Sequence, residues 1–346
     1  MRERGDPVVS VCIPSFNRAD LIGETLDSIQ AQTLDAWEAI VVDDGSTDNS
    51  IQVASEYSSR DPRVRLLRRN REPKGAGTCR NIAVESAKGR YVLFLDTDDL
   101  LAPFCLEQRV AAMEQDPSMA FGIFSMLLFK KSTSDAERLW NIDSDEDDLV
   151  RVLRINPICP GTGTLWRRAD FIKLGMWNES LTVWQDIELH LRAFAGEYKY
   201  TKRLDLPPDI FLRETESSMS RSGFQAREKL ESRALIARKA VELLRENGRE
   251  QLLPEVRFVC SSVILGAIAS GYRVLARDTI EWARNEGILT ADDARRFRIV
   301  EWLRRVKLDR LTPARVIRDR LTQPFRTPST LGQVPYRPRP WVTPGE

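Results

Sequence analysis

The sequence has no closely spaced cysteines and almost no histidine. Its five cysteines show no Cys-x-x-Cys spacing, and His190 is the one histidine among 346 residues. These counts argue against a disulfide framework and against a structural zinc cluster. The sequence also lacks a charge excess, since 52 basic side chains face 51 acidic ones and the formal net charge is +1. A protein that bound nucleic acid over its whole surface would be strongly basic, so we expect no nucleic-acid partner.

Long apolar segments are missing as well. The longest apolar stretch without charge, residues 258–272, has 15 residues, whereas a helix needs about 20 to span a bilayer. The first residues, MRERGDPVVS, lack the apolar segment of a signal peptide. With 42% hydrophobic and 30% charged residues, the composition is that of an ordinary globular protein. We therefore expect a soluble protein with a large core in the reducing cytoplasm.

Residues 8–105 alternate between strand and helix patterns. Nearly continuous apolar runs, rich in β-branched residues, predict strands buried on both faces at 8–14, 37–44, 64–68 and 90–96. Helical patterns fill the intervals at 19–32, 46–57 and 75–89. Such alternation predicts an α/β fold whose mostly parallel sheet is flanked by helices.

The pattern changes twice after this region. Residues 119–215 are less regular, with an acidic stretch at 135–148 that we interpret as a solvated loop. Residues 184–196 predict a helix with Ile187, Leu191 and Phe194 facing inward. From about residue 225 the sequence is helical, with Gly248 as a C-terminal cap and a capping box at Thr290. The last residues, 323–346, are proline-rich and predict an extended or disordered tail.

Polar clusters follow three of the predicted parallel strands. Because ligands bind at the carboxyl ends of strands in open parallel sheets, these clusters should line one crevice. The three clusters are Pro14-Ser15-Phe16-Asn17-Arg18, Asp43-Asp44-Gly45-Ser46 and Asp96-Thr97-Asp98-Asp99.

The three carboxylates of the last cluster would repel one another without a cation among them. Mg²⁺ or Mn²⁺, held partly by substrate phosphates, is the hard ion that suits such oxygen ligands. The alternative is an acidic turn in which Asp99 caps a helix. Asp43 and Asp44 can accept hydrogen bonds from a nucleotide base or ribose, or they can simply shape a turn. Gly75 and Gly77, with Arg80 after them, can admit phosphate to a helix N-terminus, or can give only loop flexibility.

Four segments in this order resemble the family 2 glycosyltransferases, nucleotide-sugar enzymes with the GT-A fold. The segments are VSVCIPSFNRADLIGETLDSIQAQT, WEAIVVDDGSTDNS, GAGTCRNIAVESAKGRYVLFLDTDD and NESLTVWQDIELHLR. The resemblance covers residues 8–220. It implies one GT-A domain over 1–220, with a donor half at 8–105 and an acceptor half at 106–220. A helical region at 221–322 and the tail would follow it.

The resemblance also implies roles for individual residues. Pro14 and Asp44 resemble the positions that hold the nucleotide base. The remaining candidate donor contacts are Phe16, Asn17, Arg18, Asp43, Gly75, Arg80, Asp96 and Thr97. Asp96 and Asp98 resemble the carboxylates that meet the ribose and the metal, and Asp186 the catalytic base of inverting members. Trp184 and His190 are candidate acceptor contacts, while Glu188 is expected to be an exposed helix carboxylate.

Two positions depart from the family pattern. Gln185 stands where glutamate is common, and Thr215 where histidine is often found, which weakens a late pyrophosphate contact. The Gln-x-x-Arg-Trp motif of processive synthases is absent. The implied reaction is therefore metal-dependent, inverting transfer of one sugar from a nucleotide-diphosphate sugar, with UDP the commonest nucleotide, to a glycan, lipid-linked or other hydroxyl acceptor. A nucleotidyltransferase, or a non-catalytic relative that binds glycan or nucleotide, is the alternative.

The carboxyl-terminal segment carries the charge that the rest of the chain lacks. Residues 291–346 hold 13 basic and six acidic side chains. Six of the basic residues lie on one predicted helix: Arg295, Arg296, Arg298, Arg304, Arg305 and Lys307. This segment can bring the protein to the anionic inner face of a membrane. Alternatively the helix covers the rest of the protein, with Ile299, Trp302, Leu303 and Val306 packed inward.

Overall fold

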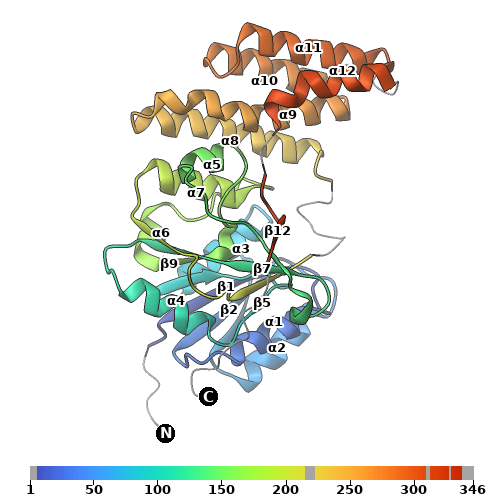
Figure 1. Cartoon of the computed structure of the whole chain (residues 1–346). Coiled ribbons are helices and arrows are strands. Elements are labelled where there is room, and N and C mark those ends of the chain that lie inside the picture. Colours follow the sequence, from blue (N-terminus) through green and yellow to red (C-terminus); the bar gives the residue numbers. More distant parts are fainter. Residues whose placement is uncertain (1–5, 215–222, 309–311, 327–328, 337–346) are drawn as a thin grey trace.

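A seven-stranded, mostly parallel sheet forms the centre of the amino-terminal domain in the computed structural model (Figure 1). The structure describes residues 6–214, 223–308, 312–326 and 329–336. The strand order is β10-β6-β9-β4-β1-β2-β3, with β1 parallel to β2 and β4, and β9 antiparallel to both of its neighbours. These features confirm the predicted α/β class.

The elements of the first half follow the predicted alternation of strands and helices. In chain order they are β1 (Val9–Ser15), α1 (Ile22–Gln30), β2 (Trp37–Asp43), α2 (Ser50–Arg60), β3 (Val64–Arg68), α3 (Ala76–Ser86), β4 (Tyr91–Phe94), β5 (Leu100–Leu101) and α4 (Cys105–Glu114). Every residue of β2 is buried, and so are all of β1 except Pro14. Burying one large aliphatic side chain contributes about 1.5–3 kcal/mol, so these central strands anchor the loops that follow them.

The second half completes the sheet and adds a smaller one. Its elements are β6 (Phe121–Phe124), β7 (Met126–Phe129), β8 (Arg138–Leu139), α5 (Asp148–Leu153), β9 (Thr164–Arg167), α6 (Arg168–Lys173), α7 (Gln185–Ala195), β10 (Tyr200–Arg203) and β11 (Ile210–Arg213). The smaller sheet has the order β12-β8-β7-β11-β5. Strand β11 thereby lies beside β5, immediately after the acidic cluster.

Five helices form a carboxyl-terminal layer beyond α5 and α7 (Figure 1). They are α8 (Arg227–Glu246), α9 (Arg257–Ser270), α10 (Arg273–Asn285), α11 (Ala291–Arg305) and α12 (Thr312–Thr322). The predicted stop at Gly248 is seen in its positive φ of 66°, and the capping box that opens α11 joins Thr290 and Asp293. Helix α8 packs on α7 and joins this layer to the amino-terminal domain.

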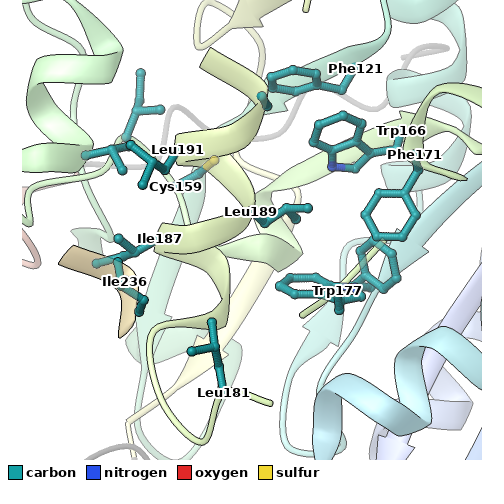
Figure 2. Packing of buried hydrophobic residues seen from close by; sticks show 14 of the residues in the cluster. Phe121, Cys159, Trp166, Phe171, Trp177, Leu181, Ile187, Leu189, Leu191 and Ile236 are labelled. Carbon is teal, nitrogen blue, oxygen red and sulfur yellow. The ribbon is translucent and has the colours of Figure 1, made fainter. Parts of the chain in front are cut away.

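Helix α7 is buried on two opposite sides (Figure 2). Ile187 points toward Ile236 of α8 and Leu191 lies beside Cys159, whereas Leu189 points toward Trp166, Phe171 and Trp177 of the amino-terminal domain. The predicted inward stripe of Ile187, Leu191 and Phe194 is buried, but so is Leu189. The amino-terminal domain thus covers the Leu189 face, which the predicted stripe leaves in water, while α8 covers Ile187.

Part of the predicted tail packs back on the amino-terminal domain. Strand β12 (Val334–Pro335) pairs with β8, and the Thr330 hydroxyl donates to Asn141 Oδ1 at 2.6 Å. Phe325, in a 3₁₀ turn, is also buried. Residues 329–336 are thus ordered by contacts that proline content does not reveal. The partner strand β8 lies inside the acidic stretch, so that stretch is only partly the solvated loop we expected.

One described helical stretch, Glu250–Ser270, is long and apolar enough to cross a membrane when judged by length and composition alone. Its mean hydropathy is 1.7 over the apolar window. More than half of that window, 56%, is buried inside the protein. The structure uses this stretch as the central helix of the carboxyl-terminal layer.

Candidate active site

The first two polar clusters are tied together at the carboxyl edge of the sheet. Asn17, which has a positive φ of 51°, accepts a hydrogen bond from Thr47 N–H through Oδ1 at 2.8 Å. Its own N–H donates to Ser46 Oγ at 2.9 Å, and Arg18 N–H donates to Ser50 Oγ at 2.7 Å. The side chain of Asn17 therefore fixes one loop against the other, and Arg18 extends from the fixed loop.

Asp43 and Asp44 have different surroundings although they are neighbours. Asp43 Oδ2 accepts from the N–H groups of Gly45 and Ser46, at 2.9 and 3.0 Å, which shapes the turn. Asp44 Oδ1 accepts from Arg69 Nε at 2.6 Å and from Gly75 N–H at 3.3 Å. The turn interpretation thus holds for Asp43, while Asp44 connects the ends of β2 and β3 to the start of α3.

Two buried oxygens of β1 and β2 have no hydrogen-bond partner in the described part of the chain. They are Asp43 Oδ1 and Ser15 Oγ, on residues that stand opposite each other in the β1–β2 register. Orphaned buried polar atoms are rare in folded proteins and mark places with a special role. Pro14, one residue earlier, is partly exposed at the same edge.

Arg80 connects the acidic cluster to the start of α7. Its Nη2 donates to Asp96 Oδ1 at 2.6 Å, and its Nη1 donates to Gln185 Oε1 at 3.1 Å. Gln185 Nε2 in turn donates to the Leu181 carbonyl at 2.6 Å. The neutral amide of Gln185 therefore satisfies both a cation and a carbonyl, which a glutamate could not do.

Strand β11 contacts the rest of the acidic cluster through the Asp99 carboxylate and the main-chain carbonyl of Asp98. Arg213 N–H donates to Asp99 Oδ1 at 3.0 Å, and Arg213 Nε donates to the Asp98 carbonyl at 3.0 Å. Burial and the neighbouring Asp96 charge raise the pKa of Asp98. Burial, with the charges of Asp98 and Asp96, raises the pKa of Asp99 well above its usual range. Thr97, which stands between Asp96 and Asp98 in the sequence, is buried.

Asp186 lies in the first turn of α7, beside the acidic cluster. Its Oδ1 accepts from Ile187 N–H at 3.0 Å. Burial raises the pKa of Asp186, the Arg80 charge opposes this shift, and the Asp96 charge adds to it. Trp184, which precedes the helix with a positive φ of 58°, is partly exposed. The Arg80 charge therefore interacts with Asp96 from the first half of the domain and with Asp186 from the second.

Two predictions on α7 are wrong. His190 is fully buried, its two ring nitrogens have no partner among the described residues, and burial lowers its pKa to about 4. It is enclosed in the core and cannot contact an acceptor in this structure. Glu188 is buried, not exposed, and forms an ion pair with Arg192 at 2.8 Å. Glu188 is buried because its partner Arg192 also donates to the Leu174 and Met176 carbonyls of the amino-terminal domain.

The glycines before α3 are constrained by the backbone and by packing. Gly75 has a φ of 147°, which side chains rarely adopt. A Cβ on Gly77 would lie 3.0 Å from Gln185 Nε2, so a small residue is needed for this approach. The Lys74 ammonium lies 3.6 Å from the centre of the Phe16 ring, which brings a cation to the edge. Backbone conformation and packing therefore account for both glycines without a bound phosphate. The space beside Gly75 is also open enough for a phosphate.

The described residues include no group of three or more His, Cys, Asp or Glu side chains arranged to hold a metal ion by themselves. Asp96 and Asp98 still fit a hard cation, because they are partly exposed oxygen donors whose charges repel each other. The other coordination positions would have to come from a phosphate ligand and water, as is usual for Mg²⁺.

Comparison with known proteins agrees with this geometry. Residues 10–175 match the sequence model described as Glycosyl transferase family 2. The match covers 166 of the 346 residues, so the amino-terminal part of the chain is similar to this family over just under half of the sequence. The GT-A fold and the residues expected from it at the sheet edge are thus found in one domain.

Curated relatives match over about a third of the chain or less. A UDP-Glc:alpha-D-GlcNAc-diphosphoundecaprenol beta-1,3-glucosyltransferase of Escherichia coli is 36% identical over 123 residues, 35% of this chain and 47% of the relative. A poly(ribitol-phosphate) beta-glucosyltransferase of Bacillus spizizenii is 41% identical over 95 residues, 27% and 15% of the two chains. The chain spans about half or less of the length of the curated relatives it matches.

Solved structures match over most of the chain. The 1–349 fragment of S. aureus TarS in complex with UDP-GlcNAc has a TM-score of 0.57 at 20% identity, over 86% of this chain and 92% of that fragment. A mannosyltransferase of Pyrobaculum calidifontis, in complex with GDP-Man and Mn²⁺, has a TM-score of 0.51 at 20% identity, over 92% and 85% of the two chains. At this identity the likeness establishes the fold.

Several residues that build the site were not predicted from the sequence. Arg69 holds Asp44, and Arg71 bridges Glu85 and Glu179 at 2.7 Å each. Asn81 donates to the Trp177 carbonyl at 2.8 Å. The signal for Arg69 and Arg71 in the sequence is only a basic run after β3, which gives no partner. Arg213 is the last residue of β11, while Thr215, two residues later, lies outside the described residues.

Proposed function

We propose that the protein is an inverting glycosyltransferase that moves one sugar from a nucleotide-diphosphate sugar, a UDP-sugar by family resemblance, to an acceptor hydroxyl. The observation that carries this proposal is the position of Asp186 and Asp96 around one cation, Arg80, at the carboxyl edge of the sheet. A base on the acceptor side and carboxylates on the donor side are what in-line displacement of a diphosphate requires.

Asp186 is suited to take the proton of the acceptor hydroxyl. Burial raises its pKa, which makes the carboxylate a stronger base than one in water. The Arg80 charge opposes this rise in the pKa of Asp186 because it favours the ionised carboxylate. Gln185, held by Arg80 and Leu181, fixes the turn that presents Asp186. A positioned general base contributes about 10²–10⁴-fold to a rate.

The donor would lie along the loops after β1, β2 and β4. Asp44 and Phe16 are available for the base and ribose, and Asp96 and Asp98 for Mg²⁺ or Mn²⁺ on the diphosphate. The metal would supply charge neutralisation to the leaving diphosphate. Arg18 acts electrostatically on Asp98 and lies on the same side, where it adds positive charge.

The relatives suggest where such a reaction belongs. One acts on a diphosphoundecaprenol-linked sugar and one on poly(ribitol-phosphate), as their descriptions state. We therefore propose assembly of a bacterial-type surface glycan or glycoconjugate. All five cysteines are free and buried, as suits a reducing cytoplasm.

The test is a panel of nucleotide sugars assayed for donor hydrolysis with Mn²⁺, with Mg²⁺ and with chelator. We expect hydrolysis of one donor that needs metal and that falls strongly in Asp186→Asn. Donor binding without hydrolysis or transfer would favour the non-catalytic relative. Release of pyrophosphate from a nucleoside triphosphate with a sugar phosphate would instead indicate a nucleotidyltransferase.

We also propose peripheral contact with an anionic membrane through α11. The packing stripe of this helix is Ala294, Phe297, Val300 and Leu303. The inward packing predicted for Trp302 and Val306 is wrong, because they are 54% and 42% exposed. An exposed indole beside arginines suits a membrane interface.

Sedimentation with anionic vesicles tests this contact. We expect binding at low salt that is lost at high salt, and about fivefold weaker binding for Trp302→Ala, which corresponds to about 1 kcal/mol. Val274→Ala, on the exposed face of α10, is the matched control. Equal sedimentation with neutral and anionic vesicles would contradict the proposal.

A further inference from the structure

A buried arginine in α8, Arg233, has no carboxylate partner among the described residues. It is 1% exposed, and its one hydrogen bond within that part of the chain runs from Nη2 to the Phe224 carbonyl, at 2.5 Å. Its Nε–H has no acceptor among the described residues. Burial alone lowers the pKa of Arg233 to about 10, so the side chain stays charged at neutral pH. An uncompensated buried charge normally costs several kcal/mol, which calls for a functional reason.

Aromatic rings surround this guanidinium without neutralising it. The Phe224 ring centre lies 3.6 Å from Cζ of Arg233, and the Trp184 ring centre lies 4.8 Å away. Cation–π contacts of this kind are worth about 0.5–2 kcal/mol. They position the cation but offer no negative charge to its N–H groups.

Arg233 lines a pocket of about 360 Å³ among the carboxyl-terminal helices. Leu265, Ile268 and Val300 give this pocket an apolar wall, and Arg304 is a further basic lining residue. No Asp or Glu is among its described lining residues. Pockets that bind small molecules are of this size, mostly apolar, with a few polar groups. Basic residues with no acidic ones select an anion.

The pocket is joined to the acceptor side of the candidate active site. Trp184 contacts Arg233 and stands two residues before Asp186. Ser232, the residue before Arg233, accepts from Thr182 N–H through Oγ at 3.1 Å. The same turn of α8 therefore holds the loop that opens α7. A ligand on Arg233 would lie behind the residues that present the base.

We propose that this pocket binds an oxyanion joined to an apolar chain, namely the phosphate end of a lipid-linked acceptor, with Arg233 as its buried anion contact. The acceptor assignment rests on the proposed glycosyltransferase function. A ligand oxygen would reach the guanidinium by displacing the Phe224 ring, which is 41% exposed at the pocket. The apolar wall would hold the first carbons of the chain.

Octyl phosphate, below its micelle concentration, is the probe, and calorimetry on the full chain is the measurement. We expect it to bind at least tenfold more tightly than inorganic phosphate or octyl glucoside, since each of these supplies only one half of the ligand. Arg233→Met should weaken octyl phosphate binding at least tenfold. Arg238→Met, which removes an exposed arginine of the same helix, should not change it.

A second variant keeps the test independent of Arg233's role in folding. Leu265→Glu adds a carboxylate to the partly exposed wall and should also abolish binding. Thermal melting provides a further readout. If Arg233 serves a ligand, Arg233→Met should melt at the same or a higher temperature, because an unpaired charge is removed. Unchanged octyl phosphate binding in both variants would overturn the proposal.

Two further measurements separate the assignments. UDP binding measured on the same samples tests the donor site, so UDP binding without octyl phosphate binding refutes the pocket alone. Octyl phosphate binding without any donor binding refutes the glycosyltransferase function and leaves an anion pocket. Competition by phosphatidic acid vesicles would show that a membrane lipid supplies the phosphate, and would overturn the acceptor assignment.

Discussion

Buried arginines have different partners at the carboxyl edge of the sheet, here called the donor edge, and in the carboxyl-terminal layer. At the donor edge Arg69 and Arg80 meet the carboxylates of Asp44 and Asp96, each at 2.6 Å. In the carboxyl-terminal layer the buried Arg233 contacts two aromatic rings and one carbonyl, and no carboxylate of the described chain. Paired charges hold loops in a fixed arrangement before any ligand arrives. An unpaired charge instead favours a ligand that completes the pair. We therefore place donor binding at the donor edge and acceptor binding beside the carboxyl-terminal layer.

The largest expected effect comes from Asp186→Asn. The amide keeps the shape of the side chain but cannot accept the proton, so turnover should fall about 10²–10⁴-fold. Donor affinity and melting temperature should stay nearly constant, because the Asp186 side chain accepts a single hydrogen bond from the described residues, from Ile187 N–H. Initial rates with a fixed donor and a calorimetric donor titration check both statements.

Glu188→Gln is the contrasting variant on the same helix. It breaks the buried pair with Arg192, so it should lower stability by about 1–3 kcal/mol while kcat of the folded enzyme is retained. Near-normal transfer by Asp186→Asn would show that the base lies elsewhere.

The alternating strands and helices of residues 8–105 could be predicted from the sequence, because the patterns that indicate them are local. A buried strand such as β2 is a continuous apolar run, and Asp43 and Asp44 at its end are adjacent in the chain. Glu188 was misjudged because its burial depends on another part of the chain, where the Leu174 and Met176 carbonyls hold its partner Arg192. His190 was misjudged because the helical pattern alone does not show that its side of α7 is covered. Arg233 carries no local signal either, since a buried and a solvated arginine look alike in a helical pattern. Partners contributed by distant elements are what the sequence alone does not specify.

The burial of His190 predicts a loss of stability in acid. Its pKa is about 4 in the folded protein against 6.5 for the free side chain, so the unfolded chain binds the extra proton between these values. Stability is therefore fully present above pH 6.5 and falls by about 3 kcal/mol as the pH drops to 4.

His190→Leu tests this directly, because leucine has similar volume and no titrating group. Denaturant titrations between pH 4 and 7.5 should show a shallower pH dependence for the variant than for the parent. Parallel stability curves would mean that His190 is protonated in the folded state or opens to solvent, which would contradict its enclosure in the core.

A smaller effect is expected at the donor edge from Asp98→Ala. Removing one of two candidate oxygen ligands should weaken metal-dependent donor binding about tenfold, or about 1.4 kcal/mol. The fold should persist, since Asp98 is partly exposed after β4. Calorimetry with Mn²⁺ and with chelator gives the measurement, and Asp20→Ala, an exposed carboxylate after β1, is the control. The same affinity for parent and Asp98→Ala in Mn²⁺ would remove Asp98 from the metal site.

The smallest expected effect, Gln185→Glu, concerns the residue that joins the two regions. A glutamate there can still accept from Arg80, but its second oxygen would face the Leu181 carbonyl, to which Gln185 Nε2 now donates. The added negative charge beside Asp186 stabilises the protonated form of that carboxyl and raises its pKa. Because the base must be ionised, the acid limb of the kcat profile should move to higher pH by about one unit, with kcat on the plateau little changed.

Gln185→Met, which removes the hydrogen bond to Arg80 without adding charge, separates the effect of the charge from the effect of losing this bond. It should lower kcat on the plateau and leave the acid limb at the same pH. A limb that moves equally in both variants would mean that Arg80, released from residue 185, controls Asp186, and not the charge at position 185.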